Sequence, residues 1–211
     1  MMDAFPPPSF MNKAEVVIIT AVAACIYGIA HDQVTVRLCM EYFSVAHPPL
    51  FRTSSPTLLA ICWGIAATLP IGTAMGVVLA LVSKSGDAPP YPTWRVARGV
   101  GVLFCAMALG ALLLGCLGYG LAQRGVVAVP AAWADEIPLE KHHRFMAAWF
   151  AHGASYFIGS VGGAFFCWQI WKRRGHPRVI AVVPQTRGDV IRATAVLLLA
   201  ALVLWWRFGR S

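Results

Sequence analysis

The sequence predicts an all-α integral membrane protein, a helical bundle of four to five transmembrane helices with two polar loops on the same, outer face. Composition is the first observation: 58% of the 211 residues are apolar and 12% are charged, and the mean hydropathy is +0.66. A soluble domain carries about 25% charged residues. The other two observations concern arrangement. Apolar residues gather in runs near the ~20 residues that cross a bilayer, and charged residues gather between these runs.

The predicted spans belong to one membrane domain, residues 14–211, which follows a Pro-rich leader at residues 1–13. They cover about residues 14–30, 57–82, 100–121, 145–171 and 190–206. The first run also has features of a signal peptide, with one Lys before it and a small-x-small pattern at its end. Because the apolar run continues past Cys25, we expect a transmembrane helix. Its retention in the mature chain stays an open alternative.

Basic residues orient the predicted bundle. Residues 1–140 hold seven Lys and Arg and eight acidic residues, whereas residues 141–211 hold ten and one. The positive-inside rule therefore places the basic stretch 172–187 on the cytoplasmic side, against anionic lipid, together with the N-terminus. Both long polar connections, 31–55 and 122–144, then lie outside. An even number of predicted crossings separates them, so they share a face in either orientation. No separate soluble domain is present to bind nucleic acid.

The first polar connection has the pattern of a strand. Between residues 34 and 43, apolar side chains alternate with polar ones, and β-branched residues come early. Pro48 and Pro49 end this pattern. We therefore expect an extended segment lying on the membrane surface.

Histidines and acidic residues of the two connections, with one histidine inside the fourth predicted span, form a candidate metal site. Imidazole and carboxylate groups are ligands for divalent transition metals such as Zn, Fe, Mn and Cu, and they also serve in acid–base catalysis. The candidates are His31, Asp32, Glu41, His47, His142, His143 and His152. No HExxH or comparable ligand spacing occurs. Ordinary headgroup-level residues are the alternative, and no catalytic residue is assigned.

One face of the fourth predicted span carries a second kind of signal. That face holds His152, Tyr156, Gly159 and Gly163 at spacings of four, three and four residues. Because glycines in membrane helices favour close packing, this face is expected to point into the bundle. An ionisable residue there is a functional candidate, and an interhelical hydrogen bond is the alternative. Gly72 and Gly76 predict a similar helix-packing face on the second span.

The strings HDQ at residues 31–33, EYF at 41–43 and HP at 47–48 resemble a loop found in an uncharacterised family of bacterial multi-pass inner-membrane proteins. The likeness runs from the end of the first predicted helix to the start of the second. No activity is known for that family. The resemblance therefore implies a bacterial inner membrane and carries no catalytic assignment.

Two functions remain open from the sequence. The first is a membrane protein with a metal-binding or catalytic His/carboxylate site on its outer face. The second is a non-catalytic accessory or structural subunit, whose glycine-lined faces pack on a partner membrane protein or on a second copy of the chain. A transporter fits less well, because the sequence shows no inverted repeat.

Overall fold

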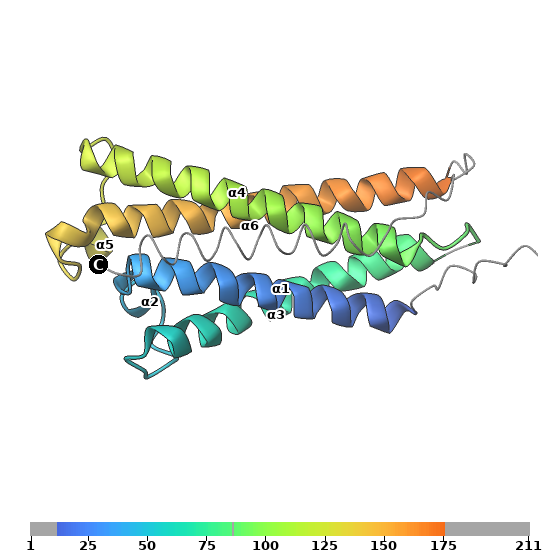
Figure 1. Cartoon of the computed structure of the whole chain (residues 1–211), viewed down its shortest axis with the longest axis horizontal. Coiled ribbons are helices and arrows are strands. Elements are labelled where there is room, and N and C mark those ends of the chain that lie inside the picture. Colours follow the sequence, from blue (N-terminus) through green and yellow to red (C-terminus); the bar gives the residue numbers. More distant parts are fainter. Residues whose placement is uncertain (1–11, 86, 176–211) are drawn as a thin grey trace, which may run out of the picture.

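The computed structural model describes residues 12–85 and 87–175, and every regular element within them is a helix. The long helices are α1 (Lys13–Leu38), α3 (Pro56–Lys84), α4 (Thr93–Gln123) and α6 (His142–Gly175). The short ones are α2 (Glu41–Ser44), α5 (Ala131–Ala134) and the 3-10 helix η1 (Leu139–Lys141). Successive long helices run antiparallel, so the connections after α1 and α4 lie at the same end of the bundle (Figure 1). The predicted leader and the predicted span at 190–206 fall outside the described residues.

Three of the long helices, α1, α3 and α4, are long and apolar enough to cross a membrane. The shortest, α1, has 26 residues, which is roughly 39 Å of helix against about 30 Å of hydrocarbon. With 34 residues α6 is longer, but it is less apolar and is not one of the three. The all-helical fold is therefore confirmed, and these three helices fit a membrane protein, while the number of crossings stays a prediction.

The prediction of an extended segment after residue 31 was wrong, because α1 continues as a helix through Leu38. Asp32, Thr35, Val36 and Cys39 are buried on one side of it, at spacings of three and four residues. That periodicity is helical and not strand-like. The polar side chains bond within α1 and to the start of α3, since Arg37 donates to the carbonyl of Gln33 and to the hydroxyl of Thr57. The alternation of apolar and polar residues therefore does not mark a strand here. It occurs in a helix that buries one of its faces.

Side-chain caps begin two of the helices. Asn12 accepts a bond from the backbone N–H of Glu15 at 2.9 Å, and the Glu15 carboxylate accepts one from the Asn12 N–H at 2.8 Å. This reciprocal arrangement is a capping box, which satisfies two backbone donors that no helical carbonyl reaches. Ser55 caps α3 at 3.4 Å, and Pro56 occupies its first turn.

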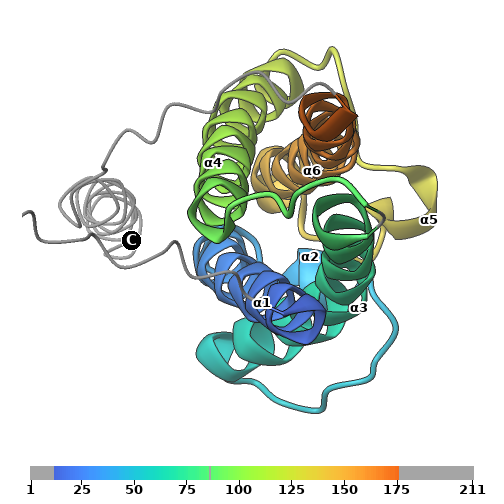
Figure 2. The same ribbon diagram turned by 90° about the vertical axis from the view of Figure 1, so that its right-hand side faces the viewer.

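The bundle is built from two helix pairs, α1 with α3 and α4 with α6, which face each other along a seam (Figure 2). Glycines set the spacing within the first pair. A Cβ atom on Gly64 would lie 2.6 Å from the backbone nitrogen of Ile29, and one on Gly76 would lie 2.8 Å from the Cα of Val17. Only glycine permits so close an approach of two helices. Gly72 also lies against α1.

Apolar side chains close the seam at both ends. The loop-end cluster holds buried residues such as Val36, Phe43, Leu59, Ile137 and Phe145. The opposite cluster holds Val16, Leu79, Tyr91, Val100 and Ile170. Between the clusters lies a cavity of about 120 Å³, which we call the seam cavity. All four long helices contribute to its wall.

Candidate metal centre

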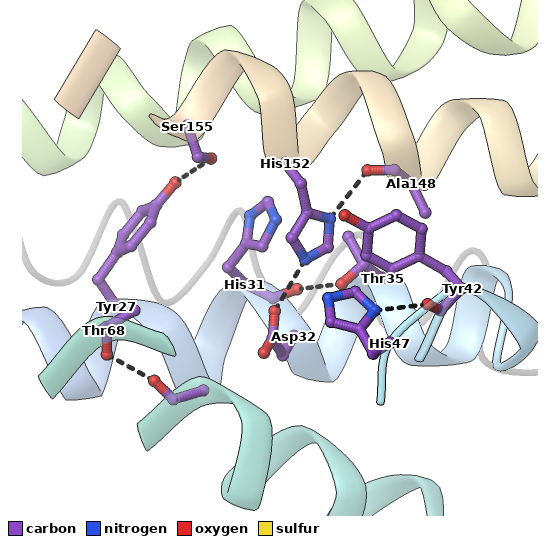
Figure 3. Close-up of polar contacts among 11 residues, drawn as sticks. Tyr27, His31, Asp32, Thr35, Tyr42, His47, Thr68, Ala148, His152 and Ser155 are labelled. Atoms are coloured by element: carbon purple, nitrogen blue, oxygen red, sulfur yellow. Dashed lines mark hydrogen bonds and ion pairs between the residues drawn. The ribbon is translucent and has the colours of Figure 1, made fainter. Parts of the chain in front are cut away.

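Two neighbouring residues of α1 meet one residue of α6 across the seam. His31, Asp32 and His152 each place one possible ligand atom within 4.8 Å of the others. His152 Nε2 lies 3.2 Å from Asp32 Oδ1 (Figure 3). The centroids of the His31 and His152 rings are 4.5 Å apart, and the ring planes form an angle of 83°. Within residues 12–85 and 87–175, no other group of three His, Cys, Asp or Glu residues converges in this way.

The two sides of the His152 ring have different partners. Nδ1 lies 2.8 Å from the carbonyl oxygen of Ala148, one turn earlier in α6. A carbonyl oxygen only accepts hydrogen bonds, so Nδ1 carries the proton. In a neutral imidazole, Nε2 then carries a lone pair, and this lone pair faces a carboxylate oxygen of Asp32. Two acceptors in contact need a cation between them, which is either a proton or a metal ion.

His31 leaves a second ligand atom available. Its Nε2 atom is buried and has no hydrogen-bond partner among the described residues. Buried polar atoms without a partner are rare, because each costs about 1–3 kcal/mol. Asp32 and His152 are themselves only 5% and 6% exposed. A transition-metal ion at this place would use the His31 lone pair, the His152 lone pair and the carboxylate together.

Aromatic rings enclose the three residues on both sides along the seam. The Tyr42 ring of α2 lies 4.4 Å from the His152 ring, between centroids. On the other side, the Tyr27 ring lies 5.8 Å from that of His31, and its hydroxyl is hydrogen-bonded to Ser155 at 2.8 Å. Such packing restricts the rotation of both imidazoles. The surroundings therefore hold the possible ligands in fixed directions.

The candidate residues of the polar connections do not join this group. Glu41 forms an ion pair with Lys141, which joins the connection after α1 to the one after α4. Partial burial by itself raises the pKa of Glu41, but the hydrogen bond from Lys141 and further bonds outweigh it and lower this pKa below its ordinary value. The same bond raises the pKa of Lys141. The Glu41 carboxylate is therefore already paired with the ammonium group of Lys141.

His142 and His143, the two candidate histidines at the start of α6, contact other parts of the protein. His142 donates from Nε2 to the carbonyls of Ile137 and Ala134, at 2.9 and 3.2 Å. The ring of His143 packs edge-on against Tyr119 at a centroid distance of 4.7 Å. Both lie at the loop end of α6, about two turns or more before His152.

His47 lies at the rim of the group without entering it. Its Nδ1 donates to the carbonyl of Tyr42 at 2.7 Å, and its ring stands 5.0 Å from the Tyr42 ring. Burial lowers the pKa of His47, against the opposing effect of that carbonyl. His47 is therefore an outer neighbour of the site, because its Nδ1 is used by the Tyr42 carbonyl and it is not one of the three residues that converge.

The other residues of the His152 face line the seam cavity. Tyr156, Gly159 and Gly163 all contribute to its wall, and Tyr156 remains 47% exposed. A Cβ atom on Gly159 would lie 3.2 Å from the Cε of Met107 in α4. The face predicted from spacing therefore points at the seam, where it lines the cavity beside His31, Asp32 and His152.

The sequence did not predict that Tyr27, Tyr42 and Ser155 would surround the two histidines. Two of them carried a usable signal. Tyr27 lies four residues before His31, and Ser155 three residues after His152, so each shares a helix face with a ligand. Tyr42 follows a break in the chain, and no periodicity connects it to His152.

No protein-family model, curated protein or solved structure matches this chain. The resemblance to a bacterial inner-membrane family therefore stays a prediction. What can be said of function comes from the geometry of the three residues and of the cavity beside them.

Proposed function

We propose that this protein is an integral membrane protein that binds one divalent transition-metal ion through His31, Asp32 and His152. The observation that carries the proposal is the pair of facing acceptors, His152 Nε2 and Asp32 Oδ1. His31 converges on them, and its buried Nε2 has no hydrogen-bond partner within the described residues. Two imidazoles and one carboxylate suit Zn and Fe, and they leave coordination positions open for a further molecule. Such open positions are typical of catalytic metal sites and not of structural ones.

The bond between His152 Nδ1 and the Ala148 carbonyl supports the same proposal. Imidazoles that ligate a metal usually donate their other N–H to a carbonyl or carboxylate, which fixes the ring and its tautomer. Here the acceptor is the helix's own backbone, at 2.8 Å. The lone pair is thereby directed across the seam before any ion arrives.

We further propose that α6 and residues 190–206 also cross the membrane, which gives four to five spans, with both polar connections on the outer face. The length of α6 supports this, as does the distribution of basic residues. Helix ends opposite the polar connections carry Lys13, Lys84, Arg95, Arg173 and Arg174. Under the positive-inside rule that end, with the N-terminus and the stretch 172–187, faces the cytoplasm and its anionic lipid. A bacterial inner membrane is the location we propose.

Elemental analysis of the purified protein tests the metal site. We expect about one transition-metal ion per chain in the wild type, and its loss in Asp32→Asn and His152→Gln. The matched controls are Asp135→Asn, an exposed aspartate, and His143→Gln, a histidine of the same helix. These keep the ion. A metal-free wild type, or ligand variants that retain the metal, would contradict the proposal and leave a shared proton between Asp32 and His152.

A non-catalytic accessory subunit is the second candidate, and the open glycine positions of α4 favour it. A Cβ atom on Gly101 or Gly120 would meet no atom of residues 12–85 and 87–175 within 4 Å. Small residues on an outward helix face allow a partner helix to approach closely. Purification of a stable complex without metal would favour this function over the metal site.

A further inference from the structure

The seam cavity adjoins the proposed metal site and has its own chemistry. Its volume is about 120 Å³, and an apolar cavity of about 150 Å³ is known to hold one benzene molecule. The seam cavity is somewhat smaller than that, so it has room for several carbons of a chain. It is not fully enclosed, so a longer molecule can extend beyond it.

The wall of the cavity is divided into a polar and an apolar part. The polar part is formed by Tyr27, His31, Asp32, His152 and Ser155. The apolar part is formed by Met75, Leu79, Val100, Leu103 and Phe166. Within the cavity wall, Thr20 donates its hydroxyl to the carbonyl of Val16 at 2.8 Å, and Thr68 donates to that of Gly64. Both threonine hydroxyls are thus used within their own helices, and Tyr156 and Ser160 contribute the other hydroxyl groups of this wall.

The apolar part is also adaptable. The ends of Met75 and Met107 lie against Gly163 and Gly159, where an added Cβ atom would clash with the Cε atom of Met75 and lie 3.2 Å from that of Met107. Methionine is unbranched and flexible, and it is common on surfaces that accept apolar molecules of varied shape. A rigid wall of branched residues would select one shape instead.

We propose that the seam cavity binds an amphiphile: its oxygen-bearing head group lies at His31, Asp32 and His152, and its apolar chain lies against α3, α4 and α6. This inference rests on the proposed metal site, because the head group would complete the coordination that three protein ligands leave open. A water-soluble, polar molecule fits less well, because most of the wall offers it no hydrogen bond. The occupant is therefore lipid-like.

The test uses cobalt-loaded protein in one detergent, since visible absorption of Co²⁺ reports a change of ligands. The probes are acetohydroxamic acid, a metal-binding head group alone, and dodecanohydroxamic acid, the same head group with a chain. We expect the chain to tighten binding by at least about tenfold, which the burial of two methylene groups already provides. The controls compare two adjacent residues of α4. Leu103→Trp fills the cavity, whereas Val102 is 62% exposed on the outer side, so Val102→Trp does not.

The advantage of the chain should fall to near onefold in Leu103→Trp and persist in Val102→Trp, with cobalt content unchanged in both. Met107→Phe is a second, milder variant that should reduce the advantage if Leu103→Trp does not fold. Equal affinity for the two probes in cobalt-loaded wild type, or an advantage that survives both cavity variants, would overturn this inference and leave the metal site standing. A wild type that binds no cobalt would overturn the metal site, and this inference with it.

Discussion

The histidines at the loop end and those in the seam lie in opposite situations. At the loop end, His47 and His142 donate to backbone carbonyls, and Glu41 is neutralised by Lys141. In the seam, His31 has a buried nitrogen with no hydrogen-bond partner among the residues that the structure describes, and His152 directs a lone pair at Asp32. Folding alone explains the first arrangement. The second leaves binding capacity unused at a cost in stability, which is how functional sites differ from structural polar contacts.

The largest expected difference between the seam histidines and the loop-end histidines is in metal affinity. We expect His31→Ala to weaken metal binding by more than about 100-fold, above the 10–100-fold typical for loss of an outer hydrogen-bonding partner. His142→Ala should leave the affinity unchanged, because both of its protein contacts are with carbonyls of the connection before α6. Competition with a coloured chelator measures both. Equal losses in the two variants would remove the distinction between the two groups.

The next effect concerns the backbone that holds α1 in place. Gly64→Ala would put a Cβ atom 2.6 Å from the backbone nitrogen of Ile29, and such overpacking costs about 1–3 kcal/mol. At Gly101, no atom of the part of the chain that the structure describes lies within 4 Å of an added Cβ. Gly101→Ala should therefore be neutral or stabilising by up to about 1 kcal/mol, since alanine favours helix over glycine. Thermal unfolding in detergent compares the two. A stable Gly64→Ala protein would mean that α1 and α3 are not held as closely as described.

The stability of the metal-free protein gives a second comparison between a loop-end histidine and a seam histidine. His142→Leu removes the donor to two carbonyls, so we expect a loss of about 1–3 kcal/mol of unfolding free energy. His31→Leu removes an unpartnered buried nitrogen, so it should be neutral or stabilising when no metal is present. Denaturant titration after chelation measures both variants. The opposite ranking would show that His31 has a structural role that its contacts do not reveal.

The smallest effect comes from the ion pair that joins the two connections. The lowered pKa of Glu41 means that its stabilisation is complete above its ordinary pKa of about 4.3 and is lost as pH falls through the lowered value. For Lys141, whose pKa is raised, the contribution is complete below about 10.4 and is lost as pH rises through the raised value. The pair should contribute less than about 1 kcal/mol. Unfolding temperatures of wild type and Glu41→Gln should differ at neutral pH and converge in acid; a constant difference would contradict this.

Composition and hydropathy were sufficient to predict a helical membrane protein, because apolar runs of these lengths have few alternatives in a bilayer. His152 was predicted to face the bundle from its spacing with two glycines, and it is buried there. Spacing along one helix can locate a face in this way. It cannot identify which residues of another helix lie opposite.

The composition of the site itself was beyond reach of the sequence. His31 and Asp32 were assigned to a loop because the apolar run of the first predicted span ends at residue 30. In the structure α1 extends to Leu38, so both residues lie on the helix. Glu41 was grouped with the ligands, yet Lys141, one hundred residues later, pairs with it. Such pairings depend on how the antiparallel helices are aligned, which one sequence does not encode in any local pattern.

X-ray absorption at the edge of the bound metal tests the central claim most directly. The account predicts a spectrum with imidazole scattering from two histidines and a first shell of nitrogen and oxygen at about 2.0–2.2 Å for zinc. In the His152→Gln protein, reconstituted with excess metal, scattering from one imidazole should disappear. A wild-type spectrum with water oxygens alone, with sulfur ligands, or with no change in the variant would contradict a metal centre at His31, Asp32 and His152.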